Sequence, residues 1–161
     1  MAAKPSGILS WSLADLAHVL RVNEGDVREY FTDGRRISFL LERRLAREVI
    51  KGSLALSEGA GFDLLDPQGA KWEVRSLSKG GIYFCPSYMV GSGRSFEEAG
   101  FLSKLSQIAG YIVSDLESFP DVPFWILPTS VVEGWWRAGE LGLNSKISRA
   151  KALILLDEWK P

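Results

Sequence analysis

Two acidic residues, Asp63 and Glu73, flank a turn that folds their segment into a β-hairpin. Pro67 suits the second position of a type I turn, and Gly69 supplies the left-handed residue that completes a three-residue hairpin loop. This turn fixes how the two strands pair. Counting outward from it places Asp63 directly across from Glu73.

Side chains alternate between the two faces of a strand, so this hairpin has one apolar face and one charged face. The charged face brings Asp63 and Glu73 within about 4.5–5.5 Å of each other at Cβ, with Arg75 two residues further along. The apolar face, which we expect to join the core, consists of Phe62, Leu64, Trp72 and Val74.

Directly opposed carboxylates repel each other unless a counterion lies between them. A divalent cation removes that repulsion, and carboxylate oxygens are ligands that Mg²⁺ prefers. The hairpin therefore predicts a Mg²⁺ site at Asp63 and Glu73, which Mn²⁺ could also fill. Arg75 is placed to neutralise charge on a reacting phosphate. The alternative is a solvated sheet face on which Arg75 is the salt-bridge partner of the two acids.

The spacing of apolar residues predicts the elements that position this hairpin. Before it we expect three helices: one that Ser12 caps and that contains Leu13 to Leu20, then Val27–Phe31 and Ser38–Lys51. The predicted strands are Phe62–Leu65, Lys71–Arg75, Ile82–Cys85 and Phe124–Leu127. We also expect a long helix that begins at a capping box of Ser95 and Glu98 and ends at Leu116. Two more helices, at Val131–Leu141 and Ile147–Leu155, complete a mixed α/β (α+β) fold.

A Gly-x-Asp hairpin followed by Glu-x-basic resembles the PD-(D/E)XK nuclease superfamily, which includes most type II restriction endonucleases. The resemblance covers roughly residues 36–127 and implies that family's α-β-β-β-α-β core, preceded here by N-terminal helices. It implies that Asp63 and Glu73 bind the metal, that Arg75 takes the catalytic lysine position, and that Glu42 is the extra acid on the helix before the hairpin. The activity implied is Mg²⁺-dependent cleavage of phosphodiester bonds in double-stranded DNA.

The chain departs from this family pattern at Arg75, where the family has lysine. Arginine stays protonated in proteins, so it can stabilise charge but cannot readily shuttle a proton. Lys79, four residues later and of the same strand parity, is the alternative for that role. The Lys-Gly-Gly sequence that Lys79 begins also predicts a turn there.

Residues 1–34 resemble a helix-turn-helix unit in front of a nuclease-like domain at residues 35–161. Arg21 stands where such units usually have glycine, at a position that favours a positive φ. The second helix carries three acidic residues that would repel phosphates, namely Glu24, Asp26 and Glu29. Both interpretations therefore stay open: helices that read DNA, and helices that only pack.

A net charge of −1 means that DNA must be bound by a local patch. The third predicted helix is strongly basic, and four of its arginines fall within about 100° of one another on the side opposite its apolar residues. These four are Arg36, Arg43, Arg44 and Arg47. Lys79 and Arg94 are further candidates. Arg94 lies in a glycine-rich loop before a predicted helix, where it could contact phosphate or a guanine edge.

The composition of the 161 residues is that of an ordinary globular chain. The single cysteine excludes an internal disulfide. The sequence has no run of about 18 apolar residues, the length that would indicate a membrane span, so we expect a cytoplasmic protein. A chain of this length offers one cleavage site, so a double-strand break implies a homodimer. The alternatives are a junction or repair nuclease on the same fold, and a non-catalytic DNA-binding regulator on a degenerate nuclease fold.

Overall fold

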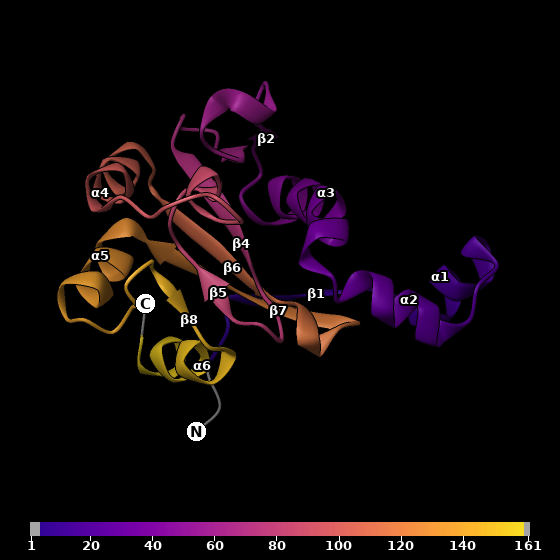
Figure 1. The fold of residues 1–161 in the computed structure, drawn as a ribbon. Helices are drawn as coiled ribbons and strands as arrows, with labels where there is room; N and C mark the ends of the chain where they lie inside the picture. The colour runs from indigo at the N-terminus through magenta and orange to yellow at the C-terminus, as the bar shows by residue number, and fades with distance from the viewer. Residues whose placement is uncertain (1–3, 160–161) are drawn as a thin grey trace.

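A six-stranded mixed sheet forms the centre of the computed structural model, which describes residues 4–159 (Figure 1). The strand order is β1-β7-β6-β4-β3-β2, in which β4 and β6 are parallel and all other neighbours are antiparallel. Its strands are β1 (Gly7–Ser10), β2 (Ser53–Leu54), β3 (Leu64–Leu65), β4 (Lys71–Leu77), β6 (Gly110–Asp115) and β7 (Asp121–Pro128). A second, two-stranded sheet pairs β5 (Ile82–Tyr83) with β8 (Lys146–Ile147).

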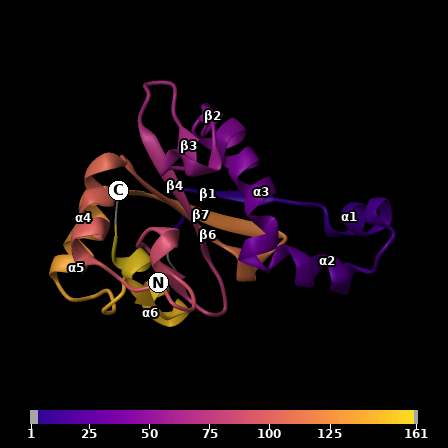
Figure 2. The same cartoon turned by 45° about the horizontal axis from the view of Figure 1, so that its top comes forward.

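Helices cover both faces of the large sheet, with α3 on one side and α4, α5 and α6 on the other (Figure 2). The α-helices are α1 (Leu13–Leu20), α2 (Glu24–Phe31), α3 (Gly34–Arg44), α4 (Glu98–Gln107), α5 (Thr129–Arg137) and α6 (Arg149–Glu158). Shorter turns are the π-helical η1 (Leu45–Val49) and the 3₁₀ turns η2 (Glu58–Ala60), η3 (Ser87–Met89) and η4 (Leu116–Ser118). The predicted α+β class is confirmed.

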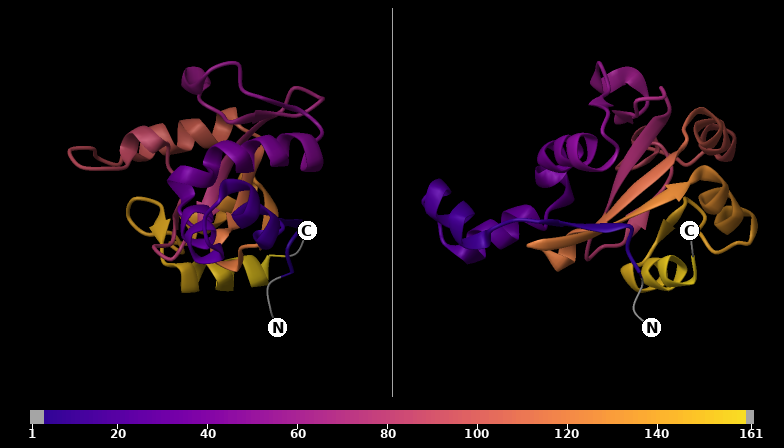
Figure 3. Two further views of the ribbon diagram at one scale, coloured as in Figure 1. Left: turned by 90° about the vertical axis from the view of Figure 1, so that its right-hand side faces the viewer. Right: turned by 180° about the vertical axis from the view of Figure 1, so that it is seen from behind.

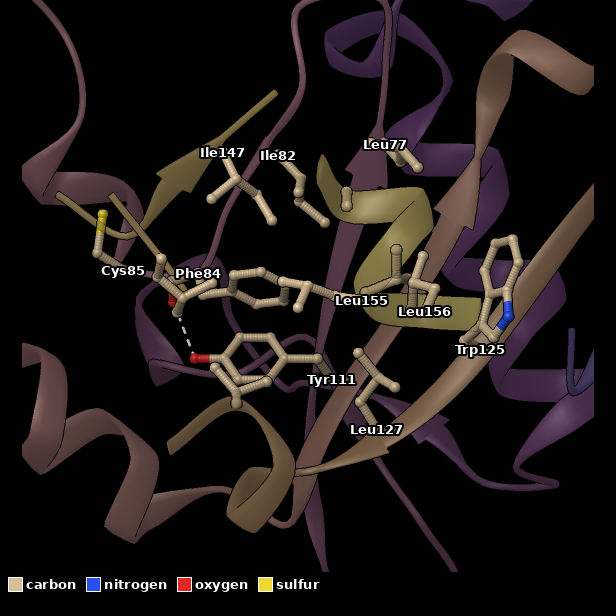
Figure 4. Packing of buried hydrophobic residues seen from close by; sticks show 14 of the residues in the cluster. Leu77, Ile82, Phe84, Cys85, Tyr111, Trp125, Leu127, Ile147, Leu155 and Leu156 are labelled. Atoms are coloured by element: carbon tan, nitrogen blue, oxygen red, sulfur yellow. Dashed lines mark hydrogen bonds between the residues drawn. The ribbon is translucent and has the colours of Figure 1, made fainter. Parts of the chain in front are cut away.

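Each face of the sheet has its own hydrophobic core. On the α4–α6 side, Tyr111 packs edge-on against Phe84 and donates a hydrogen bond to the Phe84 carbonyl at 2.8 Å (Figure 4). On the α3 side, Val74 and Ile112 pack under Leu41 of α3. The middle strands are therefore buried on both faces.

The helices α1 and α2 extend away from the two helical layers as an arm (Figure 3). Ser12 caps α1, as predicted, by accepting a hydrogen bond from the Asp15 N–H at 3.3 Å. Arg21 ends α1 with a φ of 57°, which confirms the expected left-handed position. The guanidinium of Arg28 ties α2 to the body by donating to the Phe119 carbonyl.

The prediction of one long helix from Ser95 to Leu116 is wrong. α4 begins at Glu98, without a side-chain cap, and ends at Gln107. The segment after it, Gly110–Asp115, is the fully buried strand β6. A strand covered on both faces has no polar side, so its run of apolar residues also matches a helical period.

Smaller departures occur at the edges of other elements. α3 begins at Gly34 rather than Ser38, because Asp33 caps it by accepting from the Arg35 N–H at 3.0 Å. The N-terminal segment predicted as helical also contains the edge strand β1, which pairs with β7. Phe62 was predicted on the same face as Leu64, but it packs against the core on the α4–α6 side, while Leu64 lies in the core on the α3 side. The reason is that β3 begins only at Leu64, so strict alternation does not extend to Phe62. Within residues 4–159, no helix is long and apolar enough to cross a membrane.

Candidate functional site

The hairpin that carries the site has the predicted register. Leu64 pairs with Trp72. The Asp66 carboxylate stabilises the turn by accepting a hydrogen bond from the Ala70 N–H at 2.8 Å, and the Asp66 N–H donates to the Ala70 carbonyl at 2.9 Å. This turn brings the residue before β3, Asp63, beside the middle of β4.

Asp63 is fixed by the backbone of β4. Its N–H donates to the Trp72 carbonyl at 3.0 Å, and its Oδ2 accepts from the Val74 N–H at 2.7 Å. These bonds hold the carboxylate against the strand, next to Glu73. The expected closeness of the two acids is therefore confirmed, and both line the same cavity.

Glu73 lies at the centre of a buried ion cluster and is 6% exposed. Its Oε1 is 2.8 Å from Arg75 Nη1, and its Oε2 is 2.7 Å from Lys104 Nζ. Glu73 is thus held between two buried cations, one from β4 and one from α4. Both carboxylate oxygens of Glu73 are therefore already paired with cations.

Arg75 is clamped by the protein from several sides. Its Nη2 donates to the Cys85 carbonyl at 3.1 Å, and its guanidinium lies 5.2 Å from the centre of the Tyr83 ring. Burial acts to lower the pKa of Arg75, but the Glu73 carboxylate and the nearby tyrosines outweigh it, so the pKa is raised. Arg75 therefore stays charged and holds Glu73 in place.

Lys104 of α4 belongs to the site, and sequence reasoning missed it. Its side chain is 9% exposed, and its Nζ contacts both Glu73 Oε2 and the Gly61 carbonyl. Lys104 lies three residues from Phe101 and one from Leu105, both buried on the inner face of α4. A lysine on the apolar side of a helix was the signal in the sequence, because lysine is rarely buried without a partner.

The pKa of Asp63 is raised above its ordinary value. Burial is the main cause, and the negative charge of Glu73 adds to it. The Val74 N–H and the cations of Arg75 and Lys104 act in the opposite direction without cancelling the shift. An acid held beside another acid at this energetic cost is typical of a functional site.

Two cavities meet at these acids. The larger has a volume of about 680 Å³ and the smaller about 370 Å³. Asp63, Glu73 and Ser87 line both of them, while Lys104 lines the smaller one and Arg75 the larger. The carboxylates are therefore reachable from two adjoining clefts.

Two of the residues predicted on other elements also reach the larger cavity, namely Glu42 of α3 and Lys79. Lys79 lies in the turn after β4, where its N–H donates to Glu117 Oε1 at 3.0 Å. Two cations that were not predicted line the same cavity, Arg35 and Lys146.

The four arginines predicted as a DNA-binding stripe are absent from the lining of the two clefts. Arg44 forms a bidentate pair with Glu48 at 2.7 and 2.8 Å and also donates to the Ser10 carbonyl. Arg43 stacks on Phe39, and Arg36 lies over Tyr30. Arg47 is exposed in η1.

Arg94 folds back on its own loop. Its Nη1 donates to the Ser87 and Val90 carbonyls at 3.1 and 3.2 Å. The loop does not lead directly into a helix, since α4 begins only at Glu98. The expected anion site at a helix N-terminus is therefore not formed by Arg94 and its neighbours.

The residues at the junction of the clefts fit a hard divalent cation. Asp63 and Glu73 offer carboxylate oxygens, and an ion there would share the Glu73 carboxylate with Arg75 and Lys104. Among residues 4–159 no three His, Cys, Asp or Glu side chains converge on one point. An ion at this site would thus keep most of its water, as Mg²⁺ commonly does.

No protein-family model matches this chain, and no curated protein matches it.

Proposed function

We propose that this protein is a Mg²⁺-dependent endonuclease that hydrolyses phosphodiester bonds in double-stranded DNA, on a core of the restriction-endonuclease type. The observation that carries the proposal is the convergence of Asp63 and Glu73, with Arg75 and Lys104, where two clefts meet. Paired carboxylates next to fixed cations suit the hydrolysis of an anionic ester.

In this proposal Asp63 and Glu73 hold the cation. A bound Mg²⁺ supplies charge neutralisation at the phosphate and lowers the pKa of a water molecule. The Val74 N–H orients Asp63, and Arg75 orients Glu73. Lys104 carries a strong donor that can bind a phosphate oxygen, and it offers the amine that the family pattern expects at position 75.

The charges of the site support this assignment. Asp63 and Glu73 are balanced by Arg75 and Lys104, so the ionised cluster carries no net charge before a metal binds. A divalent cation would give it an excess of two positive charges. A phosphodiester carries one negative charge, and hydroxide attack adds a second, so the site would bind the transition state more tightly than the substrate.

The larger cleft would need that cation in order to bind DNA. Its lining contains five acidic residues and four basic residues. The acids are Asp33, Glu42, Asp63, Glu73 and Glu117, and the bases are Arg35, Arg75, Lys79 and Lys146. Without a divalent ion such a cleft repels a polyanion, so DNA binding should require the divalent ion as well.

Digestion of phage DNA by the purified protein tests this function. With Mg²⁺ or Mn²⁺ we expect discrete fragments, and none in the presence of a chelator. Asp63→Asn should abolish cutting, because it removes a ligand charge while it keeps an oxygen for the Val74 N–H. Asp121→Asn, the same change at an exposed position on β7, is the matched control and should cut normally.

One observation favours a second candidate, the non-catalytic DNA-binding regulator. Both oxygens of Glu73 already face cations, so the ion cluster is balanced without a metal. A protein of this kind would bind DNA and leave it intact with either Mg²⁺ or Mn²⁺.

Comparing cleavage of simple duplex with cleavage of branched DNA separates the restriction-type activity from a junction or repair nuclease.

A further inference from the structure

One surface of the arm and α3 carries large apolar side chains in contact with solvent. Its members are 40–57% exposed. We call it the arm surface, and its apolar residues are Leu20, Val22, Tyr30, Phe39 and Leu40. Exposed apolar patches of this kind typically mark an interaction site.

Three of these side chains lie around one cavity, and the other two follow on α3. Leu20, Val22 and Tyr30 line a cavity of about 420 Å³ between α1, α2 and the start of α3, together with Arg36. The Arg36 guanidinium lies 5.7 Å from the centre of the Tyr30 ring and so joins α2 to α3. Leu40, four residues after Arg36, continues the same face of α3.

The two ends of the arm surface carry opposite charge. Asp26 and Glu29, on the same face of α2 as Tyr30, line the cavity at one end. At the other end Arg43 follows Leu40 on α3, and Arg47 follows in η1. Among the described residues, Arg36 is the one cation in the cavity lining, so the surface has a net negative charge at one end, is apolar in the middle and is basic at the other end.

We propose that the arm surface binds a second copy of this chain through a two-fold axis. A two-fold contact places each patch against itself in the reverse direction, so its two ends must complement each other. Reversal brings the acidic end of one copy to the basic end of its partner, and the apolar centres meet. The side chains of Arg43 and Arg47 therefore pair with Glu29 and Asp26 of the other copy.

Two features argue against DNA as the occupant of the arm surface. Asp26 and Glu29 would repel phosphates, and DNA offers little apolar area to cover Tyr30 and Leu40. The inference goes beyond the proposed cleavage activity and does not depend on it, since none of these residues lines the clefts that meet at the candidate site.

Sedimentation equilibrium of the full chain tests the apolar centre. Wild-type protein should be a dimer. Leu40→Glu should raise the dissociation constant by about tenfold or more, because an unpaired carboxylate would be buried in the contact. Leu143→Glu, in an exposed loop before β8, is the matched control and should leave the dimer intact. A wild-type monomer at all concentrations, or equal effects of the two variants, would overturn the proposal.

Charge reversal tests the two-fold arrangement. The double variant Arg43→Glu/Arg47→Glu should dissociate the dimer, and adding Glu29→Arg should restore part of its stability, because each reversed end again meets its complement. Circular dichroism should show an unchanged fold. If the double variant instead leaves the sedimented mass unchanged and flattens the salt dependence of DNA binding, the arginines contact phosphates and the proposal fails.

Discussion

The ion cluster around Glu73 predicts a large and specific loss of stability when its charge is removed. Glu73→Gln keeps the shape of the side chain but leaves Arg75 and Lys104 facing a neutral amide. Both cations are buried, so water cannot replace the lost charge. Removing one partner of a buried pair costs about 3–5 kcal/mol. For a chain of this size we therefore expect the melting temperature to fall by about 6–20 °C.

Thermal unfolding followed by circular dichroism measures this change. The matched control is Glu133→Gln, which removes the same charge from the solvent-exposed pair with Arg137. Exposed pairs contribute little, so the control should lose about 2 °C or less. The double variant Glu73→Gln/Arg75→Met should recover part of the loss, because it removes a cation together with the anion. If Glu73→Gln melts within about 2 °C of the wild type, the buried cluster is not as described.

Three further outcomes follow from the same geometry. The pKa of Asp63 is raised in the folded state, so binding of its proton stabilises the fold fully below the ordinary carboxyl pKa of 3.8. This stabilisation is lost as the pH rises through the raised pKa. At neutral pH, Asp63→Asn should therefore melt at or above the wild-type temperature while cutting no DNA. Arg75→Lys should retain more single-turnover cleavage than Arg75→Ala, since it keeps a cation beside Glu73; equal rates would remove the charge at position 75 from the account. The single variants Arg35→Gln and Lys79→Gln should each reduce the steepness of log K for DNA binding against log salt by about 0.9, if each residue contacts one phosphate in the larger cleft. An unchanged slope in filter binding would exclude that contact.

The hairpin could be predicted because its information is local. Pro67 and Gly69 predict a three-residue turn, and Gly69 indeed has a φ of 84°. Once the turn is fixed, alternation along two strands determines which side chains meet. The pairing of Leu64 with Trp72 and the closeness of Asp63 to Glu73 both followed from this counting.

The strand β6 could not be recognised by periodicity, because both of its faces are buried. One residue in it did carry a warning. A Cβ on Gly110 would lie 2.1 Å from the Leu127 carbonyl oxygen of the neighbouring strand, so only glycine fits there. A glycine within a predicted helix is a reason to look for a break.

The candidate site was predicted only as far as the hairpin extends. Lys104 reaches Glu73 across about thirty residues of sequence, through the packing of α4 on the sheet, and no spacing rule encodes that contact. The predicted arginine stripe assumed one regular α-helix, but α3 ends at Arg44 and Arg47 lies in the π-helical η1. The residues of α3 that line the larger cleft include Arg35 and Glu42. Helical position alone does not say which face meets the site.

The most direct test of the central claim replaces a carboxylate ligand by a thiolate. Asp63→Cys should lose cleavage of duplex DNA with Mg²⁺, which binds sulfur poorly, and regain part of it with a thiophilic cation such as Cd²⁺. Asp63→Asn should stay inactive with both cations, and wild-type protein should prefer Mg²⁺. Such a switch of cation preference would assign Asp63 as a metal ligand. Cleavage by Asp63→Cys at the wild-type rate with Mg²⁺ would contradict the account.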